Sequence, residues 1–410
     1  MLKKFIACAI LLVSMCTSMC FAENSQSSNA VDSFTWKYFS TLNKDDNIFY
    51  SPYSLTTALS VVANGSEGQT QSEILDALSS NSLDDLNSFY KSFQNDISSN
   101  YNGNGRTLAD SNLLLINKNY AANGINKEYQ KIVEDVYKST VREADFIGNL
   151  EGEKQNISKW VANKTNNFIP NYQSIVTADT IMDILNVVYF KGDWDIPFKP
   201  HYTTTEQFSN KDNTKSNVKM MNQSFKNDIK YYEDSNYKAI ELPYKRLNGR
   251  TIAAMYLVLP FNSSSLNIAD KWATESLEYK QAFLENVRTA PTFYGKVYVK
   301  LPKFELDLEN KIVTNLKSMG IQRAFTNDAE FFKMIDNSSL KIGSVNHRAK
   351  IKVDESGTEA AAVTEVEMLT TSAMPMPEVI KNFYADRPFL FIIKDVQSNV
   401  DLFVGVVNNL

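Results

Sequence analysis

The order of helical and strand-like patterns is the feature that most constrains the fold of this chain. In the first third, apolar residues recur at helical spacing over Ser54–Ala63, Thr70–Leu78 and Leu83–Ile97. Later stretches alternate or run apolar as strands do, namely Ile181–Phe190, Ile229–Leu242, Thr251–Leu259, Val297–Leu306, Lys341–Val353 and Phe389–Val407, with one helix predicted between them at Ile268–Val287. Helices followed by strands, without regular βαβ alternation, predict an α+β protein with large mixed sheets.

The first residues have the pattern of a cleavable export signal. Two lysines precede an apolar stretch at residues 5–13, and a small-x-small triplet follows at 20–22. We therefore expect a signal peptide at residues 1–22, cut after about Ala22, and a secreted, extracellular protein. No later stretch approaches the roughly 20 apolar residues of a membrane helix, so no membrane partner is expected.

All three cysteines, Cys8, Cys16 and Cys20, lie inside this predicted signal. The mature chain would then have no disulfide and no cysteine ligand for a metal, and its stability would depend on packing. Lipidation at Cys16 or Cys20 is the alternative interpretation. Met15 and Met19 stand where a lipoprotein signal favours a small residue, so a free exported protein is the preferred prediction.

The charge balance excludes several classes of partner. Removing the signal leaves 40 basic against 47 acidic residues, and the lysines and arginines are scattered among aspartates and glutamates. This acidic balance does not favour binding to a nucleic acid, and no heparin site is evident.

An enzyme is not expected either. Only His201 and His347 are available as histidines, and no G-x-S-x-G, H-E-x-x-H or phosphate-binding glycine loop occurs, so no catalytic residue, cofactor or metal is predicted.

After a polar leader at residues 23–30, no linker, repeat or break in composition divides the chain. About 380 residues would ordinarily suggest two domains. A set of short sequences, however, occurs in a fixed order. They are Asn47–Ser54, Asn186–Trp194 with Phe198, Lys219–Met221, Glu241–Tyr244, Leu301–Phe304, Met319–Ile321 with Ala324 and Phe325, and Arg387–Phe389. Together they resemble the serpin family. The resemblance implies a single serpin domain at 31–410, a monomer with about nine helices, three β-sheets and an exposed reactive-centre loop.

Several of these residues also have ordinary structural interpretations. Taken alone, Trp194 is a core residue, Ser51 and Ser54 are helix caps, and His347 is a hydrogen-bonded residue on the polar-facing register of its strand. The resemblance implies that Ser51, Ser54, Asn186 and His347 form the shutter, a hydrogen-bonded cluster beneath the sheet where it must part. It places Trp194 in the breach, where the loop enters. A buried network that must be broken and remade would act as a gate.

The segment that follows the strand ending at Val353 is the predicted hinge. Its residues are Glu355, Ser356, Gly357, Thr358, Glu359, Ala360, Ala361, Ala362, Val363 and Thr364. Glutamate and alanine also favour a helix, but the opening glycine and the β-branched residues that follow favour extended chain. The segment resembles the hinge of inhibitory serpins.

Insertion into a sheet would explain the composition of this hinge. Alternate residues would face a packed interior, where small side chains fit and a charge would be costly. Those residues are Thr358, Ala360, Ala362 and Thr364, while Glu359 and Glu365 take the other register. The hinge is therefore compatible with insertion at every inward position.

The resemblance also implies a reactive bond between Thr371 and Ser372. Alternatives for the scissile residue are Met368, Thr370, Met374 and Met376. No Arg or Lys lies between Glu355 and Val379, so an elastase-like or subtilisin-like serine protease is the expected partner. The predicted function is suicide-substrate inhibition by acyl-enzyme trapping and loop insertion. The alternative is a non-inhibitory serpin that acts as a binding or carrier protein.

Overall fold

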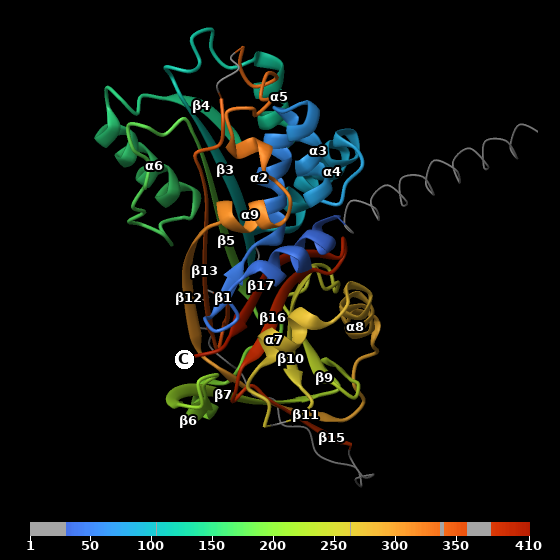
Figure 1. Ribbon diagram of the computed structural model, residues 1–410. Coiled ribbons are helices and arrows are strands. Elements are labelled where there is room, and N and C mark those ends of the chain that lie inside the picture. The colour runs from blue at the N-terminus through green and yellow to red at the C-terminus, as the bar shows by residue number, and fades with distance from the viewer. Residues whose placement is uncertain (1–29, 104, 263, 337–339, 359–378) are drawn as a thin grey trace, which may run out of the picture.

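A computed structural model describes residues 30–103, 105–262, 264–336, 340–358 and 379–410 (Figure 1). These residues contain nine α-helices and three β-sheets, which confirms the predicted α+β serpin fold. The helices are residues 30–41, α2 (Pro52–Asn64), α3 (Gly68–Ala77), α4 (Leu83–Asn100), α5 (Lys127–Asp135), α6 (Leu150–Lys164), α7 (Ile268–Thr274), α8 (Leu277–Thr289) and α9 (Val313–Ser318). The predicted signal peptide and residues 23–29 of the leader lie outside the described residues.

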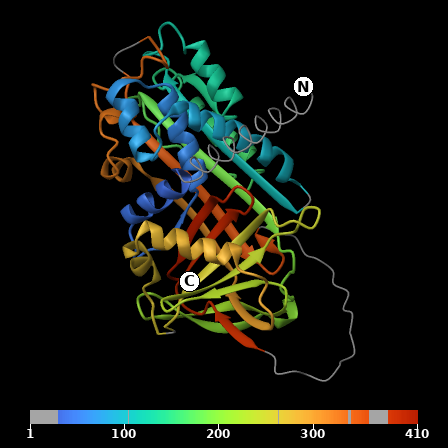
Figure 2. The same cartoon turned by 90° about the vertical axis from the view of Figure 1, so that its right-hand side faces the viewer.

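The seven-stranded central sheet runs through most of the length of the molecule (Figure 2). Its strands follow the order β12 (Phe304–Lys311), β13 (Ser344–Asp354), β14 (Gly357–Thr358), β5 (Met182–Asp193), β3 (Arg106–Asn117) and β2 (Asn102–Gly103), and β4 (Thr140–Ala144) also pairs with β3. Side chains of α2 pack on one face of this sheet, and those of α6 pack on the other. The middle strands are therefore covered on both faces.

Two further sheets lie below the helix-rich end. The six-stranded sheet follows the order β1 (Ile48–Tyr50), β17 (Val400–Val407), β16 (Phe389–Asp395), β10 (Ala253–Pro260), β9 (Tyr237–Pro243) and β8 (Lys230–Glu233). The four-stranded sheet follows the order β15 (Ile380–Tyr384), β11 (Lys296–Pro302), β7 (Lys215–Lys226) and β6 (Thr204–Ser209). Helices α7 and α8 pack against strands of the six-stranded sheet. No helix of the described residues is long and apolar enough to cross a membrane.

Several predicted elements are each two elements in the structure. The predicted strand Ile229–Leu242 is interrupted because the Asp234 carboxylate accepts the N–H groups of Asn236 and Tyr237 and closes a hairpin turn. The predicted helix Ile268–Val287 divides because Ser276 caps a new helix.

Two more predicted strands each correspond to two strands in the structure. Val297–Leu306 belongs to β11 of the four-stranded sheet and then to β12 of the central sheet, with Lys303 between them. Phe389–Val407 is the hairpin of β16 and β17. An apolar pattern does not show where a strand passes from one sheet to another.

Candidate functional site

The boundary between β5 and β13, here called the seam, is the candidate functional site. The two strands are parallel and pair directly from Asp183 with Ser344 to Val188 with Ala349. At one end of the seam, β14 lies between them and pairs antiparallel with both. The seam is therefore closed along six residue pairs and already separated at the end where the chain enters.

The start of the predicted hinge is fixed to its surroundings. The Glu355 carboxylate binds Lys303 Nζ at 2.7 Å and accepts the Thr203 hydroxyl at 2.8 Å. Burial raises the pKa of Glu355, but these bonds favour the ionised form and leave the pKa below its usual value. The backbone N–H of Phe198 donates to the Glu355 carbonyl oxygen at 2.9 Å, and that of Trp194 donates to the Ser356 carbonyl oxygen at 2.9 Å.

Gly357 is required by the close approach of the hinge to β5. Its φ of +155° lies in a range that other residues rarely adopt, and a Cβ at this position would lie 2.0 Å from the Gly192 carbonyl oxygen. Any side chain would therefore force the two strands apart. The glycine allows the chain to enter the sheet.

Thr358 is the first hinge residue with a side chain inside the sheet. It is fully buried, and its hydroxyl lies 2.8 Å from the Tyr244 hydroxyl. It pairs with Gly192 on β5 and Val353 on β13. The structure thus places Thr358 on the inward register that the sequence predicts. The other predicted inward residues, Ala360, Ala362 and Thr364, lie outside the described residues, as do Glu359, Ala361 and Val363.

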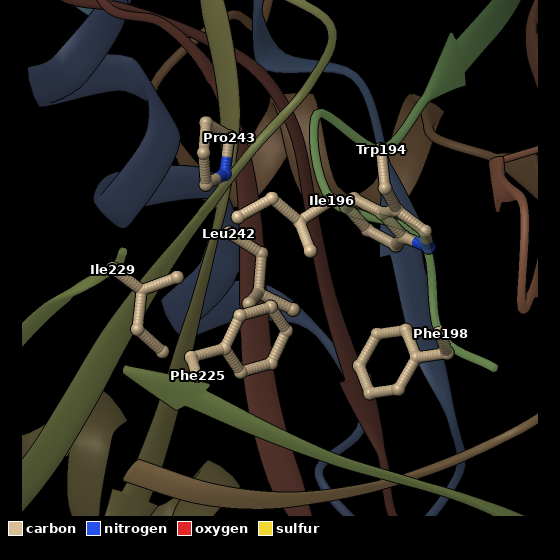
Figure 3. A pocket seen from close by; sticks show the side chains of 7 residues that line it. All are labelled: Trp194, Ile196, Phe198, Phe225, Ile229, Leu242 and Pro243. Atoms are coloured by element: carbon tan, nitrogen blue, oxygen red, sulfur yellow. The ribbon is translucent and has the colours of Figure 1, made fainter. Parts of the chain in front are cut away.

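Trp194 lies beside this entry point. Its ring stacks on Tyr244 with centroids 4.7 Å apart, and its Nε1 donates to the Asp354 carbonyl oxygen at 3.0 Å. A cavity of about 10 Å³ adjoins it, and Figure 3 shows its lining of Trp194, Ile196, Phe198, Phe225, Ile229, Leu242 and Pro243. This volume holds at most one water, and the lining is apolar, so the cavity offers no room for a ligand.

The four predicted shutter residues lie together in the structure and are all fully buried. The Ser51 N–H donates to His347 Nε2 at 3.0 Å, and the Ser51 hydroxyl donates to the Leu402 carbonyl oxygen at 2.6 Å. His347 Nδ1 bonds to Asn186 Oδ1 across the seam. Asn186 Nδ2 binds both the carbonyl and the hydroxyl oxygen of Ser54 on α2. The cluster therefore joins β5, β13 and α2.

The predicted register of His347 is wrong. The histidine shares the buried register of Val345, Ala349, Ile351 and Val353 rather than a polar-facing one. The partly exposed polar residues Arg348 and Lys350 lie on the opposite face of β13, so His347 belongs to the apolar face that packs on the core.

Its hydrogen bonds define the tautomer of His347. Because Nε2 accepts the Ser51 N–H, the proton is on Nδ1 and is donated to Asn186. Burial lowers the pKa of His347 to about 3. With an ordinary value of 6.5, its contribution to stability is complete above pH 6.5 and is lost as the pH falls toward 3.

We expect the His347 ring to stay neutral from pH 8 to pH 4. In a protein labelled with ¹⁵N-histidine, its two ring nitrogens should keep separate shifts typical of the Nδ1-protonated tautomer. The chain has only one other histidine, so a His201→Gln variant assigns the signals. A His347 signal that becomes doubly protonated between pH 7 and pH 5 would contradict the buried, neutral assignment.

The sequence interpretation missed four residues of the site. Asp110 accepts the Ser54 hydroxyl, Asn112 Oδ1 accepts Asn186 Nδ2 at 2.5 Å, and Tyr244 binds Thr358. Asp183 binds Ser344 and Asn346 across the seam. A signal was present for Asp183, because a carboxylate inside an apolar strand requires buried partners.

The predicted reactive-bond residues lie outside the described residues. They are Thr371 and Ser372, with the alternatives Met368, Thr370, Met374 and Met376. Within the described ranges, no group of three or more histidine, cysteine or acidic side chains could hold a metal ion.

The fold and the seam define a class of protein whose central sheet already holds the first residues of an entering strand. The family model described as "Serpin (serine protease inhibitor)" matches residues 29–410. The chain belongs to the serpin family.

Three known proteins illustrate the relationship. The leukocyte elastase inhibitor of Xenopus laevis is 31% identical over 388 residues, which cover 92% of this chain and 98% of the relative. The native structure of the thermophilic serpin tengpin is 26% identical with a TM-score of 0.81, over 93% of each chain. Human thyroxine-binding globulin with bound thyroxine is 26% identical with a TM-score of 0.80, over 94% of this chain and 99% of the other.

Proposed function

We propose that this serpin is a secreted suicide-substrate inhibitor of elastase-like or subtilisin-like serine proteases. The observation that carries the proposal is β14, where Gly357 and Thr358 already occupy the space between β5 and β13. Loop residues that follow them can extend this strand along the seam. The family supports protease inhibition in general, and the elastase inhibitor among its relatives supports the choice of protease.

Extending β14 in the same register supports this insertion. Because β14 is antiparallel to both strands, each step forward along the loop corresponds to one step backward along β5 and along β13. Ala360 would meet Phe190 and Ile351, Ala362 would meet Val188 and Ala349, and Thr364 would meet Asn186 and His347. The inward loop residues are small where their partners are buried, so they fit without overpacking.

The outward residues of the hinge fit this register too. Glu359 would lie between Lys191 on β5 and Lys352 on β13. Opposite charges directly across strands stabilise a sheet by roughly 0.2–1 kcal/mol per pair. The hinge thus matches both faces of the opened seam.

The trapping reaction begins as ordinary proteolysis. The protease serine attacks the Thr371 carbonyl carbon, the bond to Ser372 breaks, and the serine proton passes through the protease base to the released amine. The Thr371 ester then ties the protease to the loop. Insertion of the freed loop pulls the protease and distorts its active site before water can cleave the ester. About a dozen new hydrogen bonds at roughly 1 kcal/mol each oppose several kcal/mol of distortion.

A gel assay tests the proposed function. The mature protein is mixed with neutrophil elastase, pancreatic elastase or subtilisin. Trypsin is the control, because the segment between Glu355 and Val379 offers it no Arg or Lys to bind. We expect a denaturant-stable complex at the summed mass with one of the first three proteases and none with trypsin. Mass spectrometry of the released peptide identifies the scissile bond among Thr371 and its alternatives. Cleavage without a stable complex for every protease would contradict inhibition.

A carrier role is the second candidate. An open hollow of about 310 Å³ lies between residues 30–41, α8 and the β16–β17 hairpin, and its lining includes Asp32, Gln281, Leu284, Glu285, Lys394 and Asn399. Thyroxine-binding globulin shows that this fold can bind a small molecule. Calorimetric titration with thyroxine, alongside the gel assay, separates the two roles. The small hinge residues favour the inhibitor.

A further inference from the structure

The far end of the seam contains a second cross-strand group besides the cluster around His347. Asp183 on β5 accepts the hydroxyl of Ser344 and, at 3.0 Å, the side-chain N–H of Asn346, both on β13. Asp183 is only 2% exposed and Asn346 only 1%. These bonds cross the boundary that must part when a new strand enters.

This group faces the side of the sheet opposite to the His347 cluster. Asp183 lies on the register of Leu185 and Val187, whose side chains pack under α6. Asn186 and His347 face α2 instead. The seam is therefore held from both faces.

The partners of Asp183 leave its charge uncompensated. Ser344 and Asn346 are both uncharged, and Leu115, which pairs with Asp183 on β3, is apolar. Loss of hydration is thus the dominant influence, and burial raises the pKa of Asp183 to about 6.

The other titratable groups near this face are engaged elsewhere or exposed. Arg348 binds Asp307 at 2.7 Å and Glu309 at 3.2 Å. On β12, Lys311 lies opposite Asn346 and is exposed. Tyr172 follows α6 in the chain, and its hydroxyl lies 3.5 Å from the Glu309 carboxylate. Burial, together with the charges of Glu309 and Asp183, raises the pKa of Tyr172.

Asn346 adds a second observation. Its side-chain oxygen Oδ1 is buried and accepts no hydrogen bond from the described residues. An ionised carboxylate beside it offers no donor. A protonated carboxyl, or an amide at position 183, carries a donor that can satisfy this oxygen.

We propose that Asp183, Ser344 and Asn346 form a latch across the seam that holds β5 and β13 together more tightly when Asp183 is protonated than when it is ionised. Asp183 acts here as a positioning residue, because it touches no protease. The consequence for inhibition rests on the proposed function, in which the seam must open. The latch would slow loop insertion in acidic surroundings and release it at neutral pH.

The direction follows from proton linkage. When the seam opens, Asp183 meets water and its pKa returns toward 3.8, so opening releases a proton. Closure is therefore most favourable below pH 3.8 and weakens as the pH rises through 6. With pKa values of about 6 and 3.8, the opening equilibrium should increase about tenfold from pH 5 to pH 8.

Hydrogen–deuterium exchange on the full mature protein tests the latch without a protease. Protection factors, corrected for intrinsic exchange, are measured for peptides that cover 183–188 and 344–349 at pH 5 to 8. We expect wild-type protection to fall about tenfold across this range. Asp183→Asn should show at least the wild-type pH 5 protection at every pH, because its neutral amide mimics the protonated acid.

Asp110→Asn is the matched control. The Asp110 pKa is also raised to about 6 by loss of hydration, but its partner Ser54 lies on α2 and not across the seam. This variant should keep the pH dependence. A flat wild-type profile, or an undiminished pH dependence in Asp183→Asn, would overturn the latch. Failure of the gel assay alone would contradict the proposed function and leave the exchange result intact.

Discussion

Thr358→Arg is expected to convert the protein from an inhibitor into a substrate. Thr358 is fully buried between Gly192 and Val353, and its side-chain hydroxyl lies within hydrogen-bonding distance of the Tyr244 hydroxyl. An arginine there would bury an unpaired cation, which costs several kcal/mol, so we expect β14 to leave the sheet in the native variant and loop insertion to bear this cost. Each 1.4 kcal/mol added to the insertion barrier slows insertion about tenfold, so the protease deacylates first.

The measurement is the stoichiometry of inhibition. We expect the number of inhibitor molecules consumed per trapped protease to rise at least about tenfold, with cleaved loop as the main product. The variant should still fold, because within the described residues β14 contributes two residues to the sheet. Thr358→Ser is the matched control, since it keeps the hydroxyl and a small volume. Trapping by Thr358→Arg at the parent stoichiometry would contradict insertion through this position.

Asn186→Ala is expected to open the seam prematurely. Asn186 binds Ser54, Asn112 and His347, and its loss leaves buried polar groups without partners. Such a loss costs about 2–4 kcal/mol in a network of this kind. The free energy of unfolding in urea should fall by that amount. The half-life of inhibitory activity at 37 °C should shorten at least about tenfold, because the uncleaved loop can enter the weakened seam.

Asn222→Ala provides the comparison for this variant. Asn222 on β7 also makes several hydrogen bonds, including those to the Tyr202 and Met220 carbonyl oxygens at 3.1 and 3.0 Å. It lies in the four-stranded sheet, away from the seam. It should lower stability without shortening the lifetime of the active form. Equal loss of lifetime in both variants would show that general destabilisation, and not the seam, controls the conversion.

The sequence predicted the fold class and three helices of the first third, α2, α3 and α4, but not the helix at residues 30–41 or α5. Their apolar spacing is regular, and caps such as Ser51 and Ser82 mark where α2 and α4 begin. Strand boundaries were less predictable, because alternation continues across Lys303 although the chain changes sheets there. Periodicity reports local burial and carries no information about which strand is the neighbour.

The candidate site was predicted only in part. The resemblance named Ser51, Ser54, Asn186 and His347, and the structure places them in one hydrogen-bonded cluster. The roles of Asp110 and Asp183 could not be assigned from sequence. Asp110 binds Ser54 of α2, and Asp183 binds residues of β13, so only the three-dimensional pairing reveals these contacts.

The central claim is that the native form is metastable because its sheet can accept the loop. The direct test is to cut the loop between residues 359 and 378 with a non-target protease and to compare heat unfolding before and after. About a dozen new hydrogen bonds at roughly 1 kcal/mol each, divided by an unfolding entropy of about 0.8 kcal/mol/K for this length, predict a rise of about 15 °C in the unfolding midpoint. An unchanged or lower midpoint in the cut protein would contradict insertion into the seam.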